Sequence, residues 1–156
     1  MEHMIWFLRV FLAFFLILVI GVSSQDEHSL TQSTTTDLKF EPAIKAVIQS
    51  YGPKVLRIPS LGESLEGKLD GDEIKILITE IVNNERISLE ITGFTHLEKE
   101  TVKLVFEERE NHVQITSTLD QKTKKDSLSR LIFLFFGQNS LQVHSNTISS
   151  TLIPSK

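Results

Sequence analysis

The sequence predicts an α+β domain in which a curved antiparallel sheet, built as a meander, packs against a short N-terminal helix and a C-terminal helix. Three observations support this class. Four segments between residues 74 and 118 alternate apolar and polar residues with a period of two. A segment with helical periodicity precedes them, and a short apolar run follows them. The length of 156 residues allows one ordinary domain.

The composition excludes several classes of protein. The chain has no Cys, which rules out a disulfide scaffold, a thiolate zinc site and a cysteine nucleophile. The net charge of −4 argues against a nucleic-acid partner. Beyond the N-terminal segment, His28, His96, His112 and His144 lack the i, i+4 spacing of a helical metal site and are interpreted as separate surface histidines. We therefore expect neither a metal nor a cofactor.

Residues 1–24 are interpreted as a signal peptide or a signal anchor. Arg9 precedes an unbroken apolar run over residues 10–22, and small residues follow up to Ser24. This order is typical of a signal peptide cleaved after Ser24. Counted from Met4, the segment also approaches the length of a membrane helix, so a retained anchor is the alternative. Both interpretations predict that residues 25–156 are secreted or extracytoplasmic. The N-terminal segment would hold the protein on a membrane only if it is not cleaved.

Residues 25–37 are predicted to be a polar linker. The stretch is mostly Ser, Thr, Gln and acidic residues, and Leu30 is its one apolar side chain before Leu38. A single α+β domain is expected over residues 38–153.

The domain is expected to open with a helix over residues 41–51. Pro42 suits a first helical turn, and Ile44, Val47, Ile48 and Tyr51 share one helical face. A Gly-Pro pair at residues 52–53 ends it. Residues 55–58 and 63–69 could be short strands, and the Asp-Gly pair at residues 70–71 predicts a turn.

The meander strands are expected near residues 74–79, 86–92, 102–107 and 113–118, with a longer connection over residues 93–100. Asp126 and Ser127 can cap a helix over residues 127–136, which Gly137 would end. Residues 141–152 could extend this helix, but their Ser and Thr content leaves helix and strand both open.

This organisation resembles the START-like (SRPBCC, helix-grip) superfamily over roughly residues 38–152. Residues 65–74, LEGKLDGDEI, are similar to the run that precedes the central strands there. Residues 85–91 and 113–116 resemble later strands of that fold. The chain departs from the pattern in two ways: Trp6, in the leader, is the only Trp, and the segment between Tyr51 and Leu65 is short for the usual second helix. A small β-sandwich, a lipocalin-like barrel or an open sheet with one helix are the rival folds.

The resemblance implies non-catalytic binding of a lipid or another apolar small molecule between the sheet and the C-terminal helix. The inward apolar residues would line such a cavity, or they would simply form a tight core. The predicted lining residues are Ile48, Tyr51, Ile76, Ile78, Leu89, Ile91, Leu104, Phe106, Ile115, Ile132, Phe135 and Phe136.

Two other functions stay open. One is an extracytoplasmic protein-interaction module with a filled core and no ligand. The other is an enzyme whose residues meet only in space, because no acid–base pair, Gly-x-Ser-x-Gly elbow or phosphate loop is present in the sequence. The apolar run over residues 131–136 follows three lysines, Lys122, Lys124 and Lys125. The lysines and the run together could contact an anionic lipid surface. The alternative is a charged loop before a buried helix.

Overall fold

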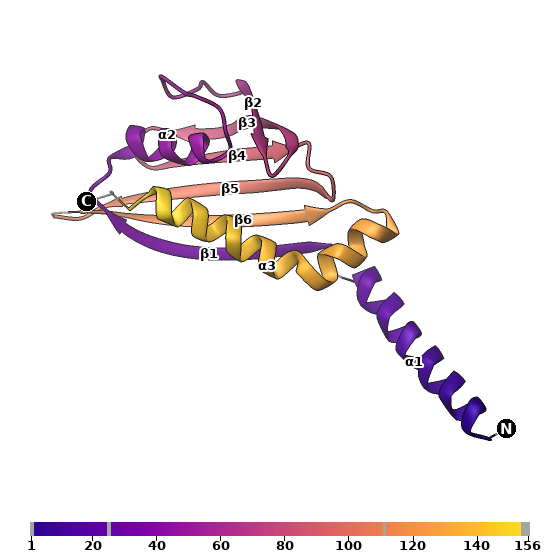
Figure 1. Cartoon of the computed structure of the whole chain (residues 1–156). Coiled ribbons are helices and arrows are strands. Elements are labelled where there is room, and N and C mark those ends of the chain that lie inside the picture. Colours follow the sequence, from indigo (N-terminus) through magenta and orange to yellow (C-terminus); the bar gives the residue numbers. More distant parts are fainter. Residues whose placement is uncertain (1, 25, 111, 154–156) are drawn as a thin grey trace.

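The computed structural model describes residues 2–24, 26–110 and 112–153 (Figure 1). In chain order its elements are α1 (Glu2–Ser24), β1 (Glu27–Thr36), α2 (Phe40–Ser50), β2 (Ser64–Leu69), β3 (Asp72–Val82), β4 (Arg86–Thr92), β5 (Leu97–Glu108), β6 (Val113–Thr123) and α3 (Ser127–Thr151). The α+β class predicted from the sequence is confirmed.

The six strands form one open antiparallel sheet in the order β1-β6-β5-β4-β3-β2. Strands β2 to β6 follow one another as a meander, as the alternating pattern predicts. The β2–β3 turn contains Asp70 and Gly71, both with positive φ, which suits the twist of a tight hairpin. Both α2 and α3 cover the same face of the sheet, α2 over its centre and α3 across β6 and β1 (Figure 1).

The predicted linker over residues 25–37 is wrong for most of its length, because residues 27–36 form the edge strand β1. This strand pairs with β6 from Glu27 opposite Lys122 to Thr36 opposite Val113. Its side chains are mainly Ser, Thr and Gln, so it carries no apolar alternation that would reveal it. Backbone pairing with β6 and half-burial of its inward residues under α3 hold it in place.

Gly137 does not end the C-terminal helix. Asp126 caps α3 by accepting a hydrogen bond from the Ser129 N–H, and the helix then continues to Thr151. Gly137 is instead a contact point, since a Cβ atom there would lie 2.9 Å from His28 Cδ2. The open choice for residues 141–152 is thereby decided in favour of helix.

Two predicted connections also differ in the structure. Residues 55–58 are not a strand, and residues 52–63 contain neither helix nor strand. The expected long connection over residues 93–100 is shorter, because β5 begins at Leu97. This extension brings Glu100 into the sheet.

Helix α1 leaves the domain at the end of the sheet where α3 begins (Figure 1). Its described side chains from His3 to Leu16 are exposed. Among the described residues, no helix reaches the combination of length and apolar character required to cross a bilayer. Cleavage, export and anchoring of this segment stay predictions.

Candidate functional site

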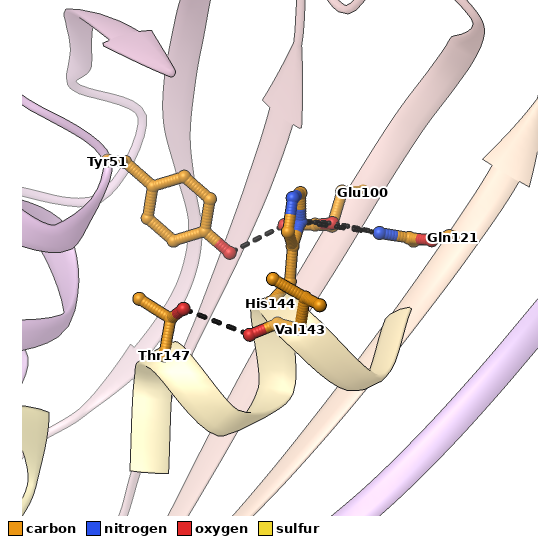
Figure 2. Close-up of polar contacts among 6 residues, drawn as sticks. All are labelled: Tyr51, Glu100, Gln121, Val143, His144 and Thr147. Atoms are coloured by element: carbon orange, nitrogen blue, oxygen red, sulfur yellow. Dashed lines mark hydrogen bonds and ion pairs between the residues drawn. The ribbon is translucent and has the colours of Figure 1, made fainter. Parts of the chain in front are cut away.

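A buried carboxylate lies at the centre of the face that α2 and α3 cover. Glu100 on β5 is 0% exposed, and three side chains surround it (Figure 2). The Tyr51 hydroxyl donates to Oε1 at 2.5 Å, and Gln121 Nε2 donates to Oε2 at 2.5 Å. His144 Nδ1 lies 2.7 Å from Oε2. We call these four residues the Glu100 cluster.

Each member of the Glu100 cluster comes from a different element. Tyr51 is the C-cap residue of α2, and its backbone N–H donates a hydrogen bond to Ile48 O. Glu100 and Gln121 are opposite each other on β5 and β6. His144 projects from α3, between the turns that bury Leu141 and Ile148. The cluster therefore exists only when both helices are docked on the sheet.

The cluster shifts the protonation of two of its members. Burial raises the pKa of Tyr51 well above its usual value, and the charge and hydrogen bond of Glu100 raise it further. Burial lowers the pKa of His144, but the hydrogen bond and charge of Glu100 outweigh burial, and the net direction is upward. Tyr51 thus stays a neutral donor, and His144 is favoured as a cation beside the carboxylate.

Two buried polar atoms next to the cluster lack a partner among the described residues. These are Gln121 Oε1 and His28 Nε2. Gln121 lies opposite His28 on β1, so the two side chains occupy one row of the sheet. The carboxylate accepts hydrogen bonds, so the Gln121 amide must present its nitrogen to Glu100. Its oxygen is consequently left as a buried acceptor without a donor.

A small hollow opens beside His144. It has a volume of about 150 Å³ and is lined by Leu69, Asp70, Asp72, Phe94, His96, Leu97, Ser140 and His144. A cavity of roughly 150 Å³ holds a molecule the size of benzene, whereas pockets for larger organic ligands measure about 300–1,000 Å³. The hollow therefore has room for a head group or one small ring, and no room for a lipid chain.

Nine of the twelve predicted lining residues lie together in one buried core. They are Ile48, Tyr51, Ile76, Ile78, Leu89, Ile91, Leu104, Phe106 and Ile115. Most are 0–2% exposed, so a water-sized sphere touches almost none of their surface. The space between the sheet and α2 is thus filled by side chains, as in the tight-core alternative.

The other three predicted lining residues are not brought to this core. Ile132 is half-buried, and Phe135 and Phe136 point outward with 60% and 63% of their surface exposed. Phe133 is the aromatic residue of this run that is buried, and its ring stacks on His28. The physical reason is the helical period, which turns only one residue in three or four toward the sheet.

The interpretation of the histidines as separate surface residues is wrong for His144 and His28. His144 is mostly buried beside Glu100, and His28 packs against Phe133. Among the described residues, no group of three or more His, Cys, Asp or Glu side chains could hold a metal ion.

The sequence does contain a signal for Glu100 and Gln121. Glu100 is an even number of residues from Val102, Leu104 and Phe106, so it shares their inward face of the strand. Gln121 shares the inward face of Ile115 and Leu119 for the same reason. A polar residue in phase with an apolar set predicts a buried polar group. The strand boundary expected after residue 100 concealed this phase for Glu100.

Comparison with known proteins gives a fold and no closer relative. No protein-family model matches the sequence, and no curated protein matches it. Among solved structures, the Aha1 dimer from Colwellia psychrerythraea is 11% identical, with 80% of this chain and 96% of that chain covered and a TM-score of 0.52. Ara h 8.0201 is 17% identical over 81% of this chain and 98% of that chain, with a TM-score of 0.49. A START superfamily protein from Mycobacterium smegmatis is 10% identical over 80% and 97%, with a TM-score of 0.45.

At these identities the comparison concerns the fold alone, and of these three structures the Aha1 dimer is similar enough to support it. The chain has the START-like helix-grip fold, and the resemblance predicted from the sequence is confirmed at that level.

Proposed function

We propose that this chain, a START-like helix-grip domain, is an exported, non-catalytic binder of an apolar small molecule that carries a hydroxyl or amino group. The observation that carries the proposal is the set of buried acceptors under α3, namely the Glu100 carboxylate and the unpartnered Gln121 Oε1. The apolar part of the ligand would lie between α3 and the sheet.

The buried acceptors favour a ligand because they are unfavourable for stability alone. Taking a carboxylate out of water costs several kcal/mol even after relaxation, and apolar residues of similar volume are often as stabilising as a buried ion pair or more so. An unpartnered buried oxygen adds a further penalty of about 1–3 kcal/mol. A ligand donor that reached Gln121 Oε1 would remove that penalty.

The ligand must displace α3, because the core is filled. Large and small residues alternate along the inner face of α3. Phe133, Leu141 and Ile148 are separated by the small residues Gly137 and Ser145. The hollow beside His144 is open at one end of this interface and has room for a head group. Entry there, followed by a shift of α3, would expose the inward faces of β5 and β6 to the ligand.

A binding role is favoured over catalysis by the accessibility of the Glu100 cluster. A general acid or base must come within hydrogen-bond distance of its substrate. Glu100 is fully buried, and its oxygens already accept from Tyr51, Gln121 and His144. Tyr51 is held as a neutral donor, since its pKa is raised. These groups suit recognition of a polar group in a fixed position.

A protein-interaction module without a ligand is the second candidate function. The filled core between the sheet and α2 is the observation that favours it. The same experiment separates it from ligand binding.

Native mass spectrometry of the full chain, produced by secretion from an expression host, tests the proposal. The protein is solvent-extracted and incubated separately with dodecanol, dodecylamine, dodecane and dodecanoate, which share one chain length. We expect the alcohol and the amine to bind about 10-fold more tightly than the alkane, the equivalent of one hydrogen bond of about 1.4 kcal/mol to the Gln121 oxygen. Dodecanoate should bind least, because Glu100 repels a second carboxylate.

Two variants connect the result to the site. Gln121→Met keeps the side-chain length and removes the acceptor, so the preference for the alcohol should fall. Gln114→Met, on the same strand near its start, is the matched control and should retain that preference. A chain that stays free of every probe would refute ligand binding and favour the interaction module. The intact mass of the secreted protein also shows whether residues 1–24 have been removed, which tests export in the same preparation.

A further inference from the structure

The outward face of α3 carries an apolar stripe that the domain does not use. Leu128, Phe135, Phe136 and Val143 are 61%, 60%, 63% and 52% exposed. Successive helical residues are separated by 100°, so these positions and the half-buried Ile132 fall within an arc of about 100°. The stripe therefore follows one side of the first two thirds of α3, with the exposed Asn139 as a polar residue between Phe136 and Val143. We call it the α3 stripe.

The α3 stripe is separate from the core contacts of the helix. The inward side is built from Phe133, Leu141 and Ile148, which are 2–4% exposed. Single exposed apolar residues such as Leu56 and Leu61 need no explanation, but several that gather on one face of a helix mark a contact surface. Removing the stripe would leave the inward contacts of α3 unchanged, so folding does not account for it.

Basic side chains lie directly before the α3 stripe. Lys124 and Lys125 are exposed in the turn that leads into α3. Among the described residues, neither forms an ion pair, whereas the neighbouring Lys122 pairs with Glu98 and Arg130 pairs with Asp26. Lys124 Nζ donates to Thr95 O at 2.9 Å, and Asp126, which follows Lys125 in the sequence, caps α3 by accepting from the Ser129 N–H. An apolar stripe beside two basic residues complements a surface that is both anionic and apolar beneath.

A second apolar surface lies at the same end of the molecule. Helix α1 contacts α3 and leaves the domain where α3 begins (Figure 1). Its exposed side chains include Trp6, Phe7, Phe11 and Phe14. Two exposed apolar surfaces thus lie close to each other and to Lys124 and Lys125, which favours lipid as the occupant of the α3 stripe.

We propose that the α3 stripe, with Lys124 and Lys125, docks the domain flat on an anionic lipid surface, with Phe135 and Phe136 inserted at the boundary of the head groups and acyl chains. The proposal rests on the outward face of α3 and is independent of the ligand proposed for its inward face. Docking would hold the axis of α3 parallel to the membrane and place the outer face of the sheet away from it.

The absence of Cys from the chain allows a site-specific test in the full-length protein. One cysteine is introduced as Phe136→Cys and labelled with the environment-sensitive dye NBD. Lys103→Cys, exposed on β5, is the matched control. Each protein is titrated with vesicles of phosphatidylcholine and phosphatidylglycerol at three to one, and with phosphatidylcholine alone. Because the dye reports its own position, a signal at residue 136 requires lipid at the α3 stripe itself, whether or not α1 also binds.

We expect NBD emission at residue 136 to intensify and shift to shorter wavelength with the anionic vesicles, and emission at residue 103 to stay unchanged. The substitutions Lys124→Gln and Lys125→Gln should each raise the lipid concentration that gives half of the maximal NBD shift by about 5-fold. An unchanged signal at residue 136 on vesicles that carry the protein would overturn the proposal. So would an equal shift with phosphatidylcholine alone. A shift that depends on protein concentration without vesicles would assign the stripe to a second copy of the chain.

Discussion

Replacing Tyr51 by phenylalanine removes one hydroxyl from the Glu100 cluster and changes little else. Tyr51 is 2% exposed, so the ring of the phenylalanine keeps the same neighbours and leaves no large cavity. The lost group donates to Glu100 Oε1 at 2.5 Å, and it is the one donor that the structure places on that oxygen. Gln121 and His144 both face the other oxygen, Oε2.

The expected loss of stability follows from this arrangement. A hydrogen bond to a charged group contributes about 1.5–3 kcal/mol. Because Tyr51→Phe leaves Oε1 buried without a donor, we expect the upper part of that range, about 2–3 kcal/mol. For a domain of this size the melting temperature should fall by about 4 °C for each kcal/mol, or about 8–12 °C in total.

Urea unfolding followed by circular dichroism measures the free energy of unfolding at neutral pH. Thr31→Val is the matched control, since it deletes a hydroxyl whose partner is the exposed Thr118 hydroxyl. The control should change stability by no more than about 0.5 kcal/mol. A loss below about 0.5 kcal/mol for Tyr51→Phe would show that the hydroxyl is not an essential donor to Glu100, and our account of the cluster would be wrong.

Three further outcomes are expected. Because the folded state raises the pKa of His144, the contribution of His144 to stability is fully present below the unfolded pKa of about 6.5 and is lost as the pH rises through the folded pKa. The free energy of unfolding should therefore fall when it is measured from about pH 6 to about pH 9. If the same fall persists in His144→Gln, another group is responsible for it. Phe133→Ala should destabilise the domain by about 3–5 kcal/mol because the ring is buried, whereas Phe135→Ala should change stability by less than about 0.5 kcal/mol; equal losses in urea unfolding would contradict the orientation of α3. Gly137→Ala should destabilise by about 1–3 kcal/mol, although helix propensity alone predicts a gain, because its Cβ would meet His28 and Phe133 at 2.9 Å; a higher melting temperature would show that the contact is not tight.

The sheet illustrates how much of the fold the sequence contains. Strands β3 to β6 have one face in the core and one face in water, so apolar and polar residues alternate along their sequences. Strand β2 is recognisable from the turn residues on either side of it. Strand β1 has no such pattern, since an edge strand of Ser, Thr and Gln is held mainly by backbone pairing. Backbone hydrogen bonds do not depend on side-chain identity, and the paired residues of β1 and β6 are 77 to 95 residues apart in the sequence, from Thr36 with Val113 to Glu27 with Lys122.

The apolar run over residues 131–136 illustrates a different limit. Its composition predicts either deep burial or contact with lipid for all of it, and the structure buries Phe133 while exposing Phe135 and Phe136. Which side chains face inward depends on where α3 crosses β6 and β1. That crossing is set in part by the close approach of Gly137 to His28, a contact between residues far apart in the sequence.

The sequence by itself determined the α+β class, the meander and the START-like resemblance, because secondary structure and one-sided burial leave local periodic patterns. The tertiary structure alone decided the Glu100 cluster. Its members are separated by 49, 21 and 44 residues from Glu100, and they meet only when α2 and α3 dock on the sheet. A buried charge is stable only with partners supplied from elsewhere in the fold, and no local pattern records which partners those are.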